Sequence, residues 1–396
     1  MDVENIISEI NYYDEVDYYD DILWPFQNRL PKVYIRDATN PFELPTQNFK
    51  KRFRFNQESV LYIVSLIRNN LVKSDNRGLP VAPEIAVLLT LRYYATASFQ
   101  VNDFDQLNCK HNNINVMCVK QFINNDKNFQ LVCGDLISLS QPTVSNVVTK
   151  VSRLLALLHK TYIKIPTGDQ ASINRQLFKD LGSHGRWPGL PGIDGAIDCT
   201  HIRIVNTPGC QHHEVYRNRK SYFSINVQAV VGPQTEFLDI VARWAGSTHD
   251  SRIFQMSRVY MKYTQGVLNG KLVGDSGYPT LPFMLTPIRP TPEDPPQIRY
   301  NRAQIKTRNI VERTFGIWKR RFPCLSKGLG NKLQTVSLII VACAVLHNLS
   351  LILNDNMALG IDSHSDQEDG ANETTVMAST SAGFVVRSTI IENYYQ

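Results

Sequence analysis

The chain has 396 residues, 43% of them hydrophobic and 20% charged, which excludes a collagen-like, coiled-coil or mostly disordered protein. Its seven cysteines have no regular spacing, which argues against a secreted disulfide scaffold and predicts an intracellular protein. Segments 1–28 and 355–396 together carry −14 of the net charge of +6, which leaves +20 on the rest of the chain. A basic body with acidic ends favours a polyanionic partner, above all nucleic acid, although a solvated basic surface would give the same charges.

Residues 29–160, which follow the acidic N-terminal segment 1–28, are expected to form an all-helical region. In the run FRFNQESVLYIVSLIRNNL, four apolar residues recur at helical spacing: Val60, Ile63, Ile67 and Leu71. Pro83 opens a second apolar run, as proline does at a helix start. The role of segment 1–28, as an arm or as a partner-binding segment, is left open by its sequence.

Residues 131–158 predict a pair of helices that is interrupted at SLSQP. Ser140 or Gln141 precedes Pro142, so a capped helix start is expected there. A short helix, a tight turn and a second helix resemble a helix-turn-helix, whose second helix would present Thr143, Ser145, Asn146 and Lys150. Many helical pairs never contact DNA, and the sequence leaves both alternatives open.

Residues 101–130 split these helices and read as an insertion, with eight Asn and no Ala, Gly, Pro or Arg. The segment begins with Val and ends with Phe-Gln, whose codons can carry the boundary signals of an intron. We hypothesise a retained intron of 90 nucleotides (30 codons) read in frame, with a lineage-specific loop as the alternative. The weak periodicity of the segment predicts an irregular excursion outside the core.

Beyond a connector over 161–195 that is rich in Gly and Pro, the pattern changes to strands. Apolar or alternating runs predict four of them: GAIDCTHIRIV, YFSINVQAVV, FLDIVARWA and KLVGDSGY. With helical patterns between and after them, they predict a mixed α/β domain over residues 196–348. The longest apolar run, 338–346, is too short to span a bilayer and predicts a buried core helix, so no membrane is expected. The polar, acidic tail 355–396 is expected to be disordered.

Three carboxylates stand where they could hold a metal. Asp198 lies within an apolar strand, Asp275 follows another, and Glu312 borders the apolar stripe of a helix. Hard divalent cations prefer such oxygen ligands, and two ions about 4 Å apart can activate a water for phosphodiester displacement. A buried carboxylate needs a partner, so the alternative is simple ion pairing. The candidate pairs are Asp198 with Arg203, Asp275 with Lys271, and Glu312 with Lys319.

Seven motifs follow in order through this domain: IDCTHIRI, YRNRKSYFSINVQAVV, WAGSTHDSRIF, GDSGYP, RYNRAQ, TRNIVERTFGIWKRRF and AVLHN. Together they resemble the PIF/Harbinger family of DDE transposases, and in particular the Harbinger transposase-derived nucleases of animals. The upstream runs LRYYATASF and SLSQPTVSNVV are similar to the helical N-terminal region of that family.

The resemblance implies an RNase H-like fold and a nuclease that uses Mg²⁺ or Mn²⁺, with a catalytic, metal-binding triad on Asp198, Asp275 and Glu312. It adds Asp250 as a metal ligand, for which an N-cap of the following helix is the alternative. Cys199 stands where the family usually has Gly, and is expected to add bulk beside the metal. Basic residues flanking the acids would contact DNA phosphates, or singly be solvated: Arg217, Arg219, Lys220, Lys319, Arg320 and Arg321.

The implied function is a divalent-metal-dependent DNA endonuclease of transposase origin that hydrolyses phosphodiester bonds by a two-metal mechanism. The resemblance also implies a Myb-like DNA-binding partner protein that aids nuclear entry, and hence a location in nucleus and cytoplasm. The main alternative is a catalytically inactive domesticated transposase that binds DNA or acts as a scaffold. A protein-interaction module that uses the acidic ends is the third. The target DNA, a homo-oligomeric state and the survival of transposition are left open.

Overall fold

The computed structural model describes residues 40–72, 81–96, 141–205, 213–355, 357 and 377–396. All of them belong to one compact unit, Thr39–Gln396. The acidic segment 1–28, the insertion 101–130 and the first helix of the pair predicted over 131–158 lie outside the described residues. The predictions made for these three segments therefore stay predictions.

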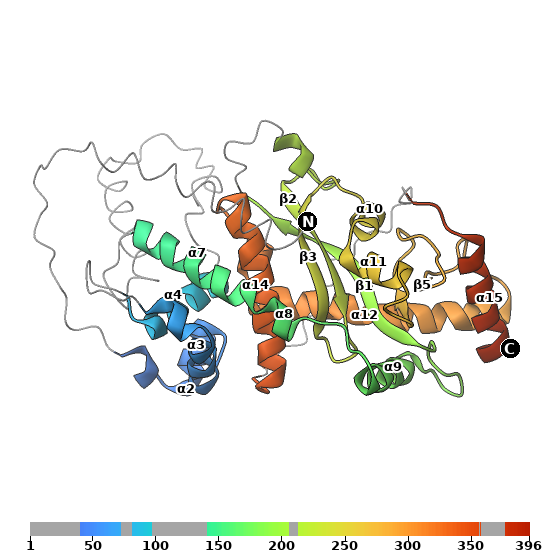
Figure 1. The fold of residues 1–396 in the computed structure, drawn as a ribbon, viewed down its shortest axis with the longest axis horizontal. Coiled ribbons are helices and arrows are strands. Elements are labelled where there is room, and N and C mark those ends of the chain that lie inside the picture. Colours follow the sequence, from blue (N-terminus) through green and yellow to red (C-terminus); the bar gives the residue numbers. More distant parts are fainter. Residues whose placement is uncertain (1–39, 73–80, 97–140, 206–212, 356, 358–376) are drawn as a thin grey trace, which may run out of the picture. The chain divides into compact units, whose positions relative to one another are not determined.

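Five strands form one mixed sheet in the order β3-β2-β1-β4-β5 (Figure 1). The central strand is β1 (Ile193–Arg203), and β2 (Ser224–Val231) and β3 (Phe237–Ala245) continue it as antiparallel neighbours. On the other side, β4 (Lys271–Val273) pairs in parallel with β1, and β5 (Met284–Leu285) in parallel with β4. The four predicted strands are confirmed as β1 to β4. The fifth was missed because two residues show no period.

Helices cover both faces of this sheet. On one face, α12 (Pro295–Arg321) and α9 (Asp169–Gly182) contact β1, and α14 (Leu333–Ile352) contacts β3. On the other face, the short helices α10 (Asp250–Gln255) and α11 (Arg258–Thr264) pack on a separate apolar cluster. Alternate residues of each strand therefore enter different cores.

The long helix α12 is positioned by its sequence at both ends. Two prolines occupy its first positions, where the missing N–H groups have no intrahelical partner to lose. Its buried residues then recur at helical spacing down to Trp318, which is fully buried and packs edge-on against Phe237 with ring centroids 5.0 Å apart. This packing fixes the helix across β1 and β2.

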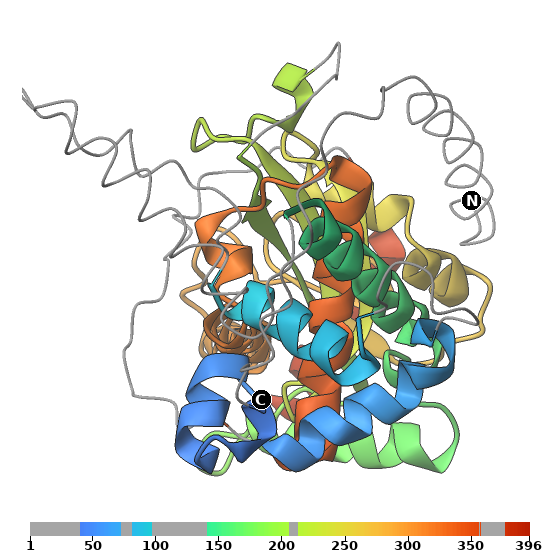
Figure 2. The same cartoon turned by 90° about the vertical axis from the view of Figure 1, so that its left-hand side faces the viewer.

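The helical region consists of α2 (Thr46–Phe53), α3 (Gln57–Leu71), α4 (Pro83–Thr96) and α7 (Gln141–Leu157). Figure 2 shows these blue, cyan and green helices together, with the orange α14 beside them. Because α14 contacts α7 on one side and β3 on the other, the region shares one core with the sheet. The short elements are η1 (Pro41–Glu43), α8 (His159–Tyr162), η3 (His213–Tyr216) and α13 (Cys324–Lys327).

The helix α14 is the one element in the described residues that is long and apolar enough to cross a membrane. In the structure, however, 72% of its apolar window is buried within the protein. Its polar residues are bonded there, since Asn348 Nδ2 donates to the carbonyl of Phe237 at 2.8 Å and His347 Nε2 lies 2.8 Å from that of Thr235. The predicted buried core helix is therefore confirmed.

Part of the predicted connector 161–195 is a helix, because α9 occupies residues 169–182. It buries Ala171 and Phe178 at helical spacing, and its Asn174 side chain donates to the Asp194 carbonyl at 2.8 Å. The flanking Gly and Pro residues obscured this short amphipathic pattern. The strand β1 also begins three residues before the predicted start of the α/β domain at 196.

The prediction of a disordered tail over 355–396 is wrong at its C-terminal end. Residues 381–394 form helix α15 (Ser381–Tyr394), which contacts α12 and β5. Ile390 and Tyr395 are buried, and Arg299 of α12 donates to the Tyr395 carbonyl at 2.7 Å. The polar composition of the whole tail concealed an apolar stretch that is long enough to dock.

Adjacent tyrosines at the end of α15 provide a test of this docking. Tyr395 is 0% exposed against Tyr300, whereas Tyr394 is 38% exposed. We expect Tyr395→Ala to lower the free energy of unfolding by about 2 kcal/mol, because it removes a buried ring and leaves a cavity. Tyr394→Ala should change it by less than about 0.5 kcal/mol. Urea denaturation of both variants measures the difference, and equal small shifts would contradict a docked helix.

Candidate active site

Two neighbouring parallel strands carry or precede the first two aspartates of the predicted triad. Ala196 of β1 pairs with Val273 of β4, so Asp198 and Asp275 each follow a paired residue by two positions. Adjacent strands lie about 4.8 Å apart, and strand residues two positions apart share a face. The register therefore places Asp198 on the face of β1 that α12 covers, and Asp275 just beyond the end of the neighbouring strand.

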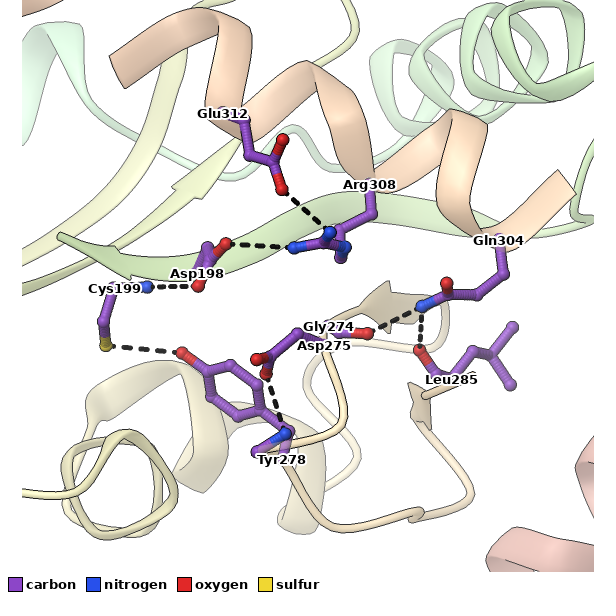
Figure 3. A network of polar contacts seen from close by, with 10 residues as sticks. Asp198, Cys199, Gly274, Asp275, Tyr278, Leu285, Gln304, Arg308 and Glu312 are labelled. Carbon is purple, nitrogen blue, oxygen red and sulfur yellow. Dashed lines mark hydrogen bonds and ion pairs between the residues drawn. The ribbon is translucent and has the colours of Figure 1, made fainter. Parts of the chain in front are cut away.

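The third carboxylate, Glu312, is tied to the first by a basic residue of α12. Arg308 Nη2 lies 2.8 Å from Glu312 Oε1, and Arg308 Nη1 lies 3.4 Å from Asp198 Oδ2 (Figure 3). Arg308 was not among the predicted partners, which were Arg203 for Asp198 and Lys319 for Glu312. The signal that could have found it is its spacing from Glu312, because residues four apart on a helix are neighbours.

The three acids differ in how firmly they are held. Asp198 is 8% exposed, and its Oδ1 accepts the backbone N–H of Cys199 at 2.8 Å. Asp275 is half-buried at the end of β4, and its Oδ1 accepts the N–H of Gly277 at 3.0 Å. The Glu312 side chain is 51% exposed on the outer part of α12. Asp198 is thus buried and held by a hydrogen bond, whereas Glu312 faces solvent.

A divalent cation would suit these oxygen donors, since Mg²⁺ and Mn²⁺ prefer carboxylates. The Arg308 guanidinium between Asp198 and Glu312 shows that these two carboxylates already face one positive charge. No three His, Cys, Asp or Glu side chains in the described ranges, however, lie close enough together to hold a metal ion. The side chains thus have the chemistry that such a cation prefers, but the described residues do not form an assembled metal site.

Asp250 is the additional predicted ligand. It is the first residue of α10, with His249 at the N-cap, and its Oδ1 accepts from Asn226 Nδ2 at 2.9 Å. The N-cap alternative is therefore wrong. Asn226 pairs across the sheet with His201, which alternation places on the face opposite Asp198. Asp250 lies near Cys199, whose pKa its charge raises, and its role as a metal ligand stays a prediction.

The side chain of Cys199 also lies on this opposite face. Its sulfur is 3.4 Å from the Tyr278 hydroxyl, and burial, followed by the charge of Asp250, raises the pKa of the thiol well above its usual value. The thiol is therefore neutral. The Cys199 side chain does not lie between Asp198 and Glu312, and its expected bulk beside a bound metal stays a prediction (Figure 3).

Three predicted phosphate contacts meet near the end of β1. Burial first, and then the charges of Lys319, Lys220 and Arg219, lower the pKa of His201 to about 4. The Lys319 ammonium donates to Thr200 Oγ1 at 2.7 Å, two residues along the strand from Asp198 and on the same face. A basic cluster from α12 and the loop before β2 thus borders the acidic site.

Two other predicted contacts are exposed and already have partners in the protein. Glu214 holds Arg217 by two bonds, with Nε–Oε2 at 2.7 Å and Nη2–Oε1 at 3.0 Å, and raises its pKa. Arg320 Nε donates to the Gly316 carbonyl in α12 at 3.2 Å. Neither bond prevents contact with phosphate, and both residues stay predicted DNA contacts.

The prediction of Arg321 as a phosphate contact is wrong. Arg321 is only 4% exposed. Its two terminal nitrogens donate to the carbonyls of Arg54 at 2.8 Å and of Asp355 at 2.6 Å. Its guanidinium also lies 5.0 Å from the ring centre of Phe55. Arg321 therefore joins α12 to the helical region and is not available to a ligand.

Comparisons with known proteins agree with this architecture. Residues 197–348 match the DDE superfamily endonuclease family. The human protein "Putative nuclease HARBI1" is 30% identical over 326 residues, which cover 81% of each chain. The Xenopus laevis protein of the same name is 26% identical over 328 residues, which again cover 81% of each chain. The Arabidopsis thaliana "Protein ALP1-like" is 32% identical over 243 residues, which cover 57% of each chain. No solved structure matches.

Proposed function

Because the chain belongs to the Harbinger transposase-derived nucleases of the DDE endonuclease superfamily, we propose that it is a divalent-metal-dependent DNA endonuclease that hydrolyses phosphodiester bonds. The observation that carries this proposal is that Asp198 and Glu312 both contact the Arg308 guanidinium, while Asp275 follows the strand next to Asp198. The basic cluster of Lys319, Lys220 and Arg219 supports a polyanionic substrate.

The fold of the catalytic domain is proposed to be RNase H-like. Three antiparallel strands that continue into two parallel ones, with helices on both faces, support this assignment. In the helical region, α7 exposes Asn146 and Lys150, which supports the proposed helix-turn-helix contact with DNA. The family resemblance alone supports the proposals of a Myb-like DNA-binding partner and of a location in nucleus and cytoplasm.

Asp198, Asp275 and Glu312 would hold the divalent cations, with Asp250 as a further proposed ligand. Bound there, the cations would supply a Lewis acid for the phosphate and lower the pKa of the attacking water. Arg308, which contacts Asp198 and Glu312, would add a positive charge beside the phosphate. Lys319, on the same face as Asp198, would hold the neighbouring backbone, since such contacts position a nucleic acid without reading its sequence.

The competing function, an inactive DNA-binding or scaffold protein, is favoured by one observation. Arg308 already offsets one of the two negative charges of Asp198 and Glu312, so this pair of carboxylates is partly compensated without a metal. The two functions therefore differ in a single measurable property, metal-dependent cleavage.

Metal removal tests the proposal on the purified full-length protein. We expect supercoiled plasmid to be nicked in Mg²⁺ or Mn²⁺, and nicking to stop with excess EDTA, because the carboxylates alone polarise no phosphate. Excess Mg²⁺ added after EDTA should restore it, which controls for irreversible unfolding. Unchanged nicking in EDTA would contradict the metal mechanism, and no nicking in either metal would favour the inactive scaffold.

A further inference from the structure

A strongly basic pocket lies outside the candidate active site, between the helical region and the end of the catalytic domain. It is a shallow hollow of about 530 Å³, open to solvent, and is lined by five cationic side chains: Lys51, Arg52, Arg54, Arg92 and Lys327. They come from α2, the turn that follows it, α4 and α13, so that three separate parts of the chain build the pocket. No acidic side chain lines it in the described part of the chain. We call it the basic pocket.

Arg54 at the end of α2 is held firmly in place. Its backbone is left-handed, with φ at 67°, a conformation that costs a non-glycine residue about 1 kcal/mol. The surrounding structure fixes it, because its N–H donates to the Lys50 carbonyl at 2.8 Å and its carbonyl accepts from Arg321 at 2.8 Å. The Arg54 Nε atom is buried and has no hydrogen-bond partner in the structure. Arg54 therefore enters the pocket from a fixed backbone and has one side-chain donor without a partner.

Two acidic side chains near the basic pocket are bound to cations outside it. Asp355 forms an ion pair with Lys50 at 2.6 Å and accepts the backbone N–H of Asn56 at 2.8 Å. Glu84 of α4 is paired with Arg68 of α3. Burial lowers the pKa of Arg54, which shows that its charge is partly removed from water without a compensating carboxylate. Such an arrangement fits an anion that enters from outside.

One helix connects the basic pocket with the candidate active site. Arg321, which holds the Arg54 backbone, is nine residues beyond Glu312 on α12. Nine helical residues span about 14 Å, which is less than the length of one turn of B-DNA, about 34 Å. The length of a duplex is therefore compatible with contacts to both ends of this part of α12.

We propose that the basic pocket binds phosphates of the DNA backbone that flank the cleavage site. This inference rests on the proposed function and names a second surface for its substrate. Guanidinium and ammonium groups are the side chains that bind phosphate, and they do so without reading the base sequence. The pocket would thus position the duplex while the carboxylates perform the chemistry.

The test uses two variants of the full-length protein and one matched control. Lys51→Gln/Lys327→Gln removes two exposed charges from the pocket, and Arg54→Asn removes the guanidinium while Asn tolerates the left-handed backbone. Lys160→Gln/Lys262→Gln removes the same charge from exposed positions elsewhere. Binding of a fluorescent 30-bp duplex (about three helical turns) is measured by anisotropy at several salt concentrations, without divalent cations. Thermal melting establishes that each variant is folded.

Each lost phosphate contact should reduce the slope of log K against log salt by about 0.9. We therefore expect a decrease of about 1.8 in the slope and roughly tenfold weaker binding for Lys51→Gln/Lys327→Gln. Arg54→Asn should weaken binding, and the control should keep the wild-type slope. Wild-type slopes in both pocket variants would overturn the proposal. So would a pocket-dependent binding of poly-glutamate without a change in DNA binding, which would indicate an acidic protein partner.

The outcome is separable from that of the proposed nuclease function. Binding is measured without divalent cations, so a protein that never nicks DNA can still lose affinity when the pocket charges are removed. That result would keep the pocket and reject the nuclease. Normal nicking by wild-type protein, with wild-type slopes in both pocket variants, would keep the nuclease and reject the pocket.

Discussion

Replacement of Asp198 by Asn is expected to lower divalent-dependent nicking by at least about 10³-fold, because it removes the charge of the innermost proposed ligand. The amide keeps the shape of the side chain and an oxygen that can accept the Cys199 N–H. Arg308 keeps its contact with Glu312 at 2.8 Å. The free energy of unfolding should therefore fall by only about 1–2 kcal/mol, as one charged hydrogen bond is weakened in a buried place.

Nicking assays and thermal melting of the same preparations would measure both effects. Asp169→Asn, at an exposed position of α9, is the matched control and should nick like the wild type. Wild-type nicking activity of the Asp198→Asn variant in Mg²⁺ would contradict the assignment of the triad. Loss of activity together with unfolding would be resolved by Glu312→Gln, because Glu312 is more than half exposed and its loss should leave the fold intact.

The sequence alone predicted those site residues in which a carboxylate interrupts or follows an apolar strand pattern. Asp198 stands in an otherwise apolar strand and Asp275 directly follows another, so their positions could be derived before the register Ala196↔Val273 was known. That their strands are neighbours could not, because pairing between strands depends on contacts far apart in the chain. Arg308 could not be predicted as a partner of Asp198 for a related reason, since 110 residues separate the two in the chain.

Averages over long segments account for the other errors. The tail 355–396 is polar as a whole, yet its last residues bury Ile390 and Tyr395. The connector 161–195 is rich in Gly and Pro, yet α9 lies between them. In both cases a short amphipathic stretch finds a surface to pack on, and its stability comes from that tertiary packing more than from the propensity of its residues.

The neighbours Arg320 and Arg321 show how a helical period separates residues of identical chemistry. The apolar stripe of α12 runs through Phe315, Trp318 and Phe322, and Arg321 follows Trp318 by three positions. Residues three and four apart share a face, so Arg321 turns inward with the stripe. Arg320 is exposed. Grouping the run of basic residues by composition alone concealed this difference.

Arg321→Ala is accordingly expected to lower the free energy of unfolding by about 3 kcal/mol. The change leaves the carbonyls of Arg54 and Asp355 without their charged donors and opens a gap beside Phe55. Arg320→Ala should change stability by less than about 0.5 kcal/mol, because its side chain is exposed. Urea denaturation of the two variants compares adjacent, chemically identical deletions. Equal and small losses would show that Arg321 is not the link between α12 and the helical region.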